Sequence, residues 1–211
     1  LSLREDHNQQ FGRNATGGAS YGYRFANGLR AVATYGTAFK APTFNELYFP
    51  NFGSPDLDPE DARHVEVSLT GSTAGYAWAL NAFQTRIHDL IAFDADLGAP
   101  ANIDRARIQG VEAQLGTAWQ ALKLQTYLTW LRPENDAAGA DDGNTLPRRR
   151  PRSARLDADY EHRRFSAGLS LFGASRGYDN IANTTRLHGY ATLNLRLGWR
   201  VLPQWLLQLE G

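Results

Sequence analysis

Residues 187–209 read LHGYATLNLRLGWRVLPQWLLQL. From Ala191 to Trp199 every second residue is apolar, and the residues between them are polar or small. This strict alternation predicts a β-strand with one apolar face and one polar face. After a short connection at Pro203, the same alternation resumes at Trp205. The two tryptophans therefore flank one short turn on the same apolar face.

Aromatic residues beside turns are typical of a transmembrane β-barrel, in which they form a belt at each edge of the bilayer. The rest of the chain repeats this arrangement. The aromatic residues beside the predicted short turns are Phe25, Tyr76, Trp78, Trp119, Tyr160, Phe165, Trp199 and Trp205. A second set lies near the predicted long loops: Phe39, Phe93, Trp130, Phe172 and Tyr190. Together they predict two aromatic belts.

Predicted connections alternate between short and long along the whole chain. The short turns follow about every second strand, and the long loops cover residues 6–14, 39–61, 94–104, 133–151 and 175–186. About eleven strands result when the partial first and last ones are counted, each near the ten-residue length of a membrane strand. The slip in alternation between Leu80 and Phe83 predicts a β-bulge. The fold class is all-β, as a transmembrane antiparallel β-barrel.

An open sheet edge cannot face lipid, because its unpaired backbone groups would cost several kcal/mol each. The predicted strands must therefore belong to a larger closed barrel. The chain contains no Met and opens and closes within the alternating pattern, so we expect residues 1–211 to be a single segment of a longer protein. The alternative, a soluble β-sandwich or propeller, explains the alternation but neither the aromatic belts nor the asymmetric loops.

The composition of the chain excludes several classes of function. Basic and acidic residues balance at 22 each, so no bulk charge favours a nucleic-acid partner. The absence of Cys excludes disulfides, thiolate metal sites and Cys nucleophiles. The chain contains no run of about 18 apolar residues, so no membrane-spanning helix is predicted. No hydrolase or phosphate-loop motif occurs, so we do not expect an enzyme or catalytic residues.

Two passages resemble TonB-dependent outer-membrane receptors. YGTAFKAPTFNELYFP, from Tyr35, precedes SPDLDPED and VEVSLTG, and NIDRARIQGVEAQL spans residues 102–115. Three more passages are similar to the vitamin B12 (cobalamin) branch of this family. They are LSLREDHNQQFGRNATG at the start, LPRRRPRSARLDADY over residues 146–160, and GASRGYDNIANTTRLHGYATLNLRL over residues 173–197.

The resemblance implies the second half of a barrel of about 22 strands that encloses a plug. It implies import of cobalamin across the bacterial outer membrane, driven by the TonB complex of the inner membrane. The plug, the closing strand and the family's calcium-binding loops are expected outside this chain, and no covalent cofactor is expected. The alternatives are a ferric siderophore or haem receptor and, in another class, an adhesin or outer-membrane enzyme. We expect a monomer that contacts lipid and lipopolysaccharide.

The resemblance also suggests ligand-binding residues. Arg148 matches an arginine that contacts the corrinoid, and an arginine there can donate several hydrogen bonds to the amides or phosphate of cobalamin. Tyr178 follows the family pattern, but the family's contacting tyrosine falls near Ala182, so Tyr178 or Asn180 would substitute for it. The alternative for Arg148 is a basic rim that pairs with lipopolysaccharide phosphates or with the acidic half of its own loop.

Other acids have simpler explanations. Asp94, Asp96 and Asp104 are a candidate site for a hard cation, although solvated loop carboxylates are commoner. No metal site is therefore assigned. Four acids are predicted to point away from lipid, where they would solvate the barrel interior and contact the plug: Glu66, Glu112, Asp157 and Asp159.

Overall fold

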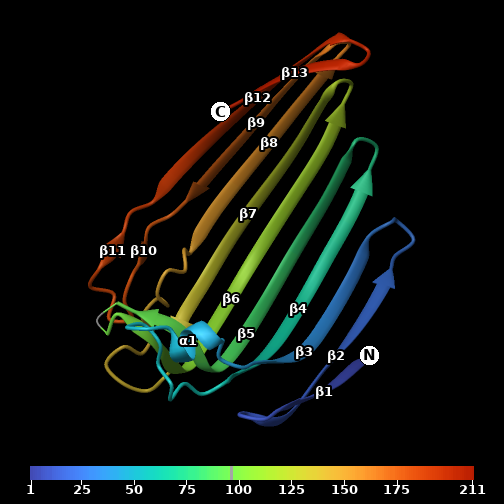
Figure 1. The fold of residues 1–211 in the computed structure, drawn as a ribbon. Coiled ribbons are helices and arrows are strands. Elements are labelled where there is room, and N and C mark those ends of the chain that lie inside the picture. Colours follow the sequence, from blue (N-terminus) through green and yellow to red (C-terminus); the bar gives the residue numbers. More distant parts are fainter. Residues whose placement is uncertain (96) are drawn as a thin grey trace.

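The computed structural model describes residues 1–95 and 97–211 and consists of one large antiparallel β-sheet (Figure 1). Eleven strands pair in chain order. They are β1 (Ser2–Asn8), β2 (Gly12–Arg24), β3 (Arg30–Lys40), β4 (Glu60–Thr73), β5 (Tyr76–Asp94), β6 (Ala99–Trp119), β7 (Leu122–Asn135), β8 (Arg152–His162), β9 (Phe165–Ala174), β12 (Tyr190–Leu202) and β13 (Trp205–Glu210). The long loops contain a short helix and a small hairpin: α1 (Phe44–Tyr48), β10 (Gly177–Tyr178) and β11 (Arg186–Leu187). The predicted all-β antiparallel architecture is confirmed.

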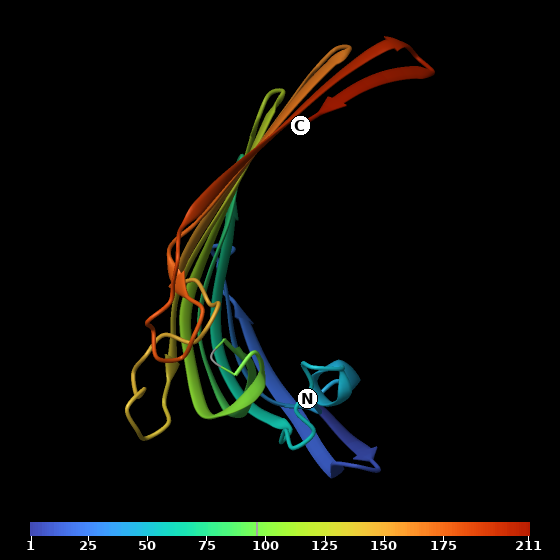
Figure 2. The ribbon, with the colours of Figure 1, turned by 60° about the vertical axis from the view of Figure 1, so that its left-hand side comes forward.

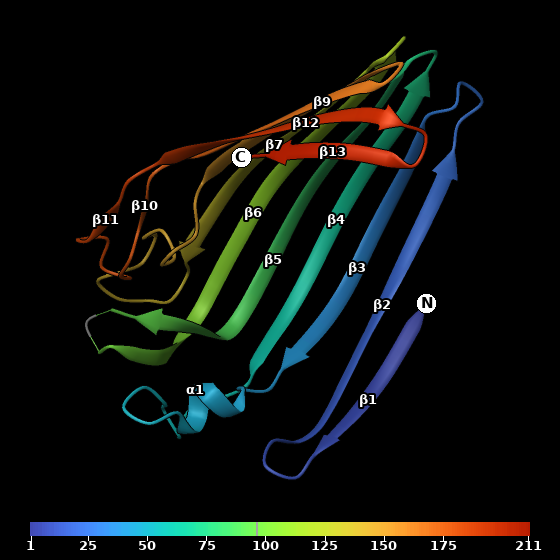
Figure 3. The same ribbon diagram turned by 45° about the horizontal axis from the view of Figure 1, so that its top comes forward.

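The sheet is strongly curved and its strands run obliquely, as Figures 2 and 3 show from two directions. β1 and β13 are its two edge strands. Closure by further strands stays a prediction. Within residues 1–95 and 97–211, no helix has the length and apolar character needed to cross a bilayer.

The predicted alternation of short and long connections is confirmed only in part. The β3–β4, β7–β8 and β9–β12 connections are long, whereas only a few residues separate β1 from β2 and β5 from β6. Turns gather at one end of the sheet and longer loops at the other (Figure 1). The predicted loops over residues 6–14 and 94–104 are too long, because most of their residues belong to strands. Asp6 pairs with Asn14 in the β1–β2 hairpin, and Asp94 pairs with Ala99 in the β5–β6 hairpin. Strands that rise above the bilayer into water carry polar residues on both faces, so alternation disappears while the hydrogen-bonded ladder continues.

The predicted bulge between Leu80 and Phe83 is also wrong. The β4–β5 and β5–β6 registers run without a shift through these residues. Phe83 stands on the polar face, where a side chain on Gly110 would put its Cβ 2.5 Å from the Phe83 ring. Gly110 thus makes room for an aromatic ring in regular register. The backbone irregularity lies instead at Asp89, whose φ is 55°.

The register aligns apolar side chains across the sheet. One row joins Val67, Ala82, Val111 and Trp130 through direct cross-strand partners. The next row toward the turns joins Leu69, Leu80, Ala113 and Leu128. We call this side of the sheet the apolar face and the opposite side the polar face. In a membrane barrel, the apolar face contacts lipid and the polar face lines the interior.

No second layer covers the apolar face within the part of the chain that the structure describes. Leu193, Leu195 and Leu197 follow one another on β12 and remain 53%, 49% and 55% exposed. A soluble sandwich would bury such residues, since each fully buried leucine contributes about 1.5–3 kcal/mol. The exposed apolar face therefore argues against the sandwich and for contact with lipid.

The aromatic belt beside the turns is confirmed, because its members are exposed next to the short connections, as for Trp119 at 69% and Trp205 at 65%. The prediction of a second aromatic belt near the long loops is wrong in part. Phe172 and Tyr190 have the opposite parity to Leu171 and therefore stand on the polar face. Alternation decides the face that each ring occupies, and nearness to a loop in the sequence does not.

A charge introduced on the apolar face tests this orientation. Leu195→Arg places a guanidinium near the middle of the apolar band and should destabilise the full-length protein by about 2–4 kcal/mol. The control Asn194→Arg adds the same charge one residue away on the polar face and should cost far less. Urea unfolding in lipid vesicles measures both, and equal losses would contradict the assignment of the faces.

Candidate ligand-binding site

The long loops are anchored to the extended β5–β6 hairpin by a small apolar core. Ile87 and Ala106 lie on β5 and β6, and Leu146 from the β7–β8 loop packs against them with no exposed surface. Ile181, from the β9–β12 loop, is packed against the same cluster. The hairpin is therefore the support on which two loops distant in sequence meet.

The β3–β4 loop is pinned to the same hairpin. Leu47 of α1 and Leu57 form a buried cluster with Ile91 of β5. Ser54 Oγ donates a hydrogen bond to the Pro100 carbonyl at 2.7 Å. Three long loops thus share one rigid base, as a binding site built from loops requires.

α1 is short and depends on its first turn. The Thr43 N–H donates to Glu46 Oε2 at 2.7 Å, and the Glu46 N–H donates to Thr43 Oγ1 at 3.3 Å, which forms a capping box. Partial burial opposes ionisation of Glu46. The hydrogen bonds from Thr43 and the ammonium of Lys40 outweigh that effect and lower the pKa of Glu46.

The pH dependence of α1 follows from the lowered pKa. A carboxyl with a depressed folded-state pKa stabilises fully above its ordinary value of 4.5 and loses that contribution as pH falls through the lower folded value. We expect protection of the Leu47 amide from hydrogen exchange, corrected for intrinsic rate, to be constant above about pH 5 and to fall below 4.5. Glu46→Gln should remove this dependence; an unchanged profile would contradict the role of Glu46.

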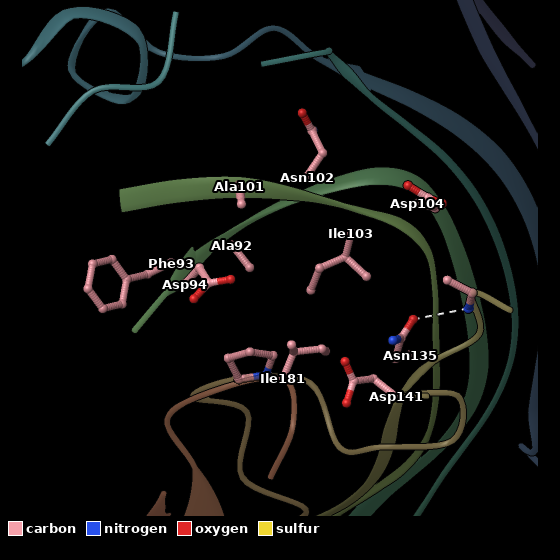
Figure 4. Close-up of a pocket in the computed structure, with 12 residues that line it drawn as sticks. Ala92, Phe93, Asp94, Ala101, Asn102, Ile103, Asp104, Asn135, Asp141 and Ile181 are labelled. Atoms are coloured by element: carbon pink, nitrogen blue, oxygen red, sulfur yellow. Dashed lines mark hydrogen bonds between the residues drawn. The ribbon is translucent and has the colours of Figure 1, made fainter. Parts of the chain in front are cut away.

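A cleft of about 210 Å³ lies between the hairpin tip and the loops (Figure 4). Its walls are mixed, with apolar and polar side chains from four segments. They are Ala92, Phe93, Asp94, Ala101, Asn102, Ile103, Asp104, Asn135, Ala137, Asp141, Pro147 and Ile181. The volume is below the range of about 300–1,000 Å³ typical of sites that enclose a drug-sized ligand. The cleft can therefore hold only one edge of a large ligand.

Arg148 lies beside this cleft in a fixed arrangement. Its backbone is left-handed, with φ of 54°, and its N–H donates to the Tyr178 carbonyl at 2.7 Å. Its Nε donates to Asp179 Oδ1 at 2.5 Å, and its guanidinium stacks 4.1 Å from the centre of the Phe93 ring. Half of the side chain, 52%, remains exposed. Within the described part of the chain, its terminal amino groups make no hydrogen bond, so they can bind a ligand acceptor.

The alternative pairing of Arg148 with its own loop is wrong. Its partner is Asp179 of the neighbouring loop, while Glu134 and Asp136 pair with Arg107 at 3.3 Å and 3.2 Å. The sequence alone does not predict that Asp179 pairs with Arg148. Its position directly after Tyr178 was the available signal, but a contact between two loops depends on how they pack.

Asn180 has a structural role. It is 2% exposed, its Nδ2 donates to Thr184 Oγ1 at 2.7 Å, and its Oδ1 accepts from the Thr184 and Thr185 N–H groups at 3.1 Å. These bonds close the 180–185 turn. Tyr178 is half buried, and its backbone pairs with Arg186. The structure brings Tyr178 close to Arg148, and ligand contact by any of the three residues stays a prediction.

The suggested cation site is not assembled among the described residues. Asp94 and Asp104 both line the cleft, toward opposite ends in Figure 4. Asp96 lies outside the residues that the structure describes. Across residues 1–95 and 97–211, no group of three or more potential metal ligands occurs.

The polar face carries paired charges along β8, β9 and β12. Asp157 accepts hydrogen bonds from Arg155 Nε at 2.7 Å and Ser170 Oγ at 2.6 Å. Arg196 Nη2 donates to Asp159 Oδ1 at 2.8 Å. All four acids predicted to point away from lipid are on this face: Glu66, Glu112, Asp157 and Asp159. Their contact with a plug stays a prediction.

Comparison with known families decides the assignment. The family described as TonB dependent receptor-like, beta-barrel, matches residues 1–211. The chain belongs to this family. TonB-dependent receptors are β-barrel proteins of the bacterial outer membrane, which agrees with the exposed apolar face and the aromatic belt of this sheet.

Individual relatives share the barrel. The chain is 33% identical over 207 residues to a protein of Photobacterium profundum described as vitamin B12 transporter BtuB, covering 95% of this chain and 34% of that one. Among solved structures, the ferric yersiniabactin uptake receptor FyuA from Yersinia pestis matches with a TM-score of 0.78 at 19% identity, over 94% of this chain and 32% of that one. Copper transporter OprC matches with a TM-score of 0.76 at 20% identity, over 94% and 33%. The chain thus spans about a third of these relatives.

Proposed function

We propose that this receptor segment belongs to a TonB-dependent importer of cobalamin in the outer membrane. The observation that carries the proposal is the 33% identity, across 95% of the chain, to a protein described as a vitamin B12 transporter. The solved structures are at most 20% identical in the two comparisons above, so they support the fold and not a ligand. The plug, its contact with TonB, the remaining strands and a monomeric state belong to the proposal. It assigns no catalytic step.

Arg148 is the proposed polar contact to the ligand. Asp179 and Phe93 hold its guanidinium, and the side chain stays half exposed, so its terminal N–H groups are accessible to a ligand. Cobalamin carries amide and phosphate oxygens that accept such bonds, and a preorganised arginine loses little rotamer entropy on binding. The apolar wall formed by Phe93, Ile103 and Pro147 would contact the edge of the corrin ring.

The cleft is too small for its lining residues to enclose a whole corrinoid. At about 210 Å³ it receives part of a corrinoid, and the rest of the ligand would contact surfaces supplied by the remainder of the protein. Capture by the outer loops would then precede rearrangement of the plug when TonB pulls on it. The calcium sites implied by the family would lie in that remainder.

Equilibrium binding of cyanocobalamin to the full-length, detergent-purified protein tests the proposal. Arg148→Ala should weaken binding about 10-fold or more, because hydrogen bonds from a charged donor contribute about 1.5–3 kcal/mol. Arg152→Ala, which removes an exposed arginine from the same passage, is the matched control and should bind as the wild type does. Binding of a ferric siderophore or haem, with no binding of cyanocobalamin, would contradict the proposed ligand. It would not affect the assignment to the family.

Asp179→Asn tests whether Arg148 is preorganised. The substitution removes the ion pair while keeping the shape of the side chain, so the Arg148 guanidinium becomes more mobile. We expect cyanocobalamin affinity to fall by a smaller factor than in Arg148→Ala, with no additional loss in the double variant. Independent, additive losses in a double-mutant cycle would contradict a shared role.

A further inference from the structure

Three arginines lie side by side on the apolar face, at its loop end. Arg63 of β4 is the direct cross-strand partner of Arg86 of β5, which is in turn the partner of Arg107 of β6. All three have the same parity as the lipid-facing side chains Val67 and Val111. Like charges directly opposite each other destabilise a sheet. A negatively charged partner would therefore stabilise this row of three arginines.

Among the described residues, the counter-charge lies at one end of the row. Arg107 Nη2 contacts Glu134 Oε2 at 3.3 Å and Asp136 Oδ1 at 3.2 Å. The side chains of Arg63 and Arg86 are exposed and make no ion pair or hydrogen bond within residues 1–95 and 97–211. Among the described residues, the Arg107 Nε is buried and has no hydrogen-bond partner.

The neighbouring rows of residues do not neutralise the excess positive charge of the three arginines. The next row toward the loops joins Asp61, His88 and Arg105, so it adds one carboxylate and one guanidinium. Among the described residues, Asp61 makes no ion pair. The row toward the turns joins Gln84, Gln109 and Arg132. Gln109 donates a hydrogen bond to Gln84 at 2.7 Å, and Arg132 pairs with Glu134, which it shares with Arg107. The patch formed by Arg63, Arg86 and Arg107, here called the arginine row, thus keeps a net positive charge.

The arginine row lies at the height of lipid headgroups. Arg86 follows Tyr76, in the aromatic belt beside the turns, by ten residues of the same strand. At a rise of about 3.3 Å per residue and a tilt of about 40°, it lies about 25 Å above that belt, which is the height of the apolar band of a barrel. Trp130 and the apolar row of Val67 lie below it. The arginines therefore face the outer-leaflet interface.

We propose that the arginine row binds a phosphate group of an outer-leaflet lipid of the lipid A type. Guanidinium groups bind phosphate through paired hydrogen bonds, and a phosphate between Arg63 and Arg86 offsets the repulsion that the register imposes. Free phosphate shares this chemistry. The lipid is favoured because the apolar rows begin below the row of Gln84 and Gln109, two rows from the arginines, where acyl chains would pack.

Titration of the full-length protein with diphosphoryl lipid A, followed by native mass spectrometry, tests the proposal. The double variant Arg63→Gln/Arg86→Gln should lose about 10-fold or more in affinity, and lipid A without phosphates should bind wild type and variant alike. Arg24→Gln/Arg30→Gln is the matched control. Those arginines are also direct cross-strand partners, but they lie beside a turn at the opposite end of the sheet. This control should bind as the wild type does.

Thermal unfolding, without and with lipid A, supplies a second readout. Without lipid A, the Arg63→Gln/Arg86→Gln variant should be at least as stable as the wild type, because a repulsion is removed. With lipid A, the wild type should gain more in Tm than the variant. Equal lipid A affinity of wild type and variant, or an equal loss in the Arg24→Gln/Arg30→Gln control, would overturn the proposal. Displacement of lipid A by millimolar inorganic phosphate would overturn the lipid as the source.

Discussion

The structure depends on one constraint: in lipid, every backbone N–H and C=O must find its partner within the protein. Between the edge strands β1 and β13, the constraint is met by pairing each strand with its neighbours in chain order, through ten consecutive antiparallel ladders. Side-chain parity follows from the ladder, so the register that satisfies the backbone also sorts apolar residues to one face. The rows through Val67 and Leu69 are a consequence of that sorting.

Above the bilayer the constraint is relaxed, and the chain uses the strands differently. β5 and β6 continue as a hairpin beyond Asp89, where the left-handed backbone interrupts the alternation. The hairpin then serves as a base for three loops through two small apolar clusters. Arg148 lies where these loops meet, held by Phe93 of the hairpin and Asp179 of another loop. The same strands thus serve as a membrane wall below and as a scaffold for the candidate site above.

Errors in sequence interpretation occurred where alternation stopped being informative. Strand ends in water carry polar residues on both faces, so Asp6 and Asp94 were placed in loops although both are paired. Phe83 suggested a bulge because a large ring broke the expected polar face, and the compensating residue, Gly110, lies far away in sequence. Phe172 and Tyr190 were assigned to a belt from nearness to a loop, whereas their parity places them on the polar face.

The sequence by itself determined the antiparallel all-β fold and most of the lipid-facing side chains, because a period of two and an aromatic residue beside each short turn are local properties. It indicated the family through passages that resemble TonB-dependent receptors. It also singled out Arg148 through a short passage. Only the tertiary structure decided what each loop residue does: it made Asn180 a buried support, paired Arg148 with Asp179, and aligned Arg63 with Arg86 and Arg107. These outcomes depend on register between strands and packing between loops, which join residues tens of positions apart and leave no periodic trace in the chain.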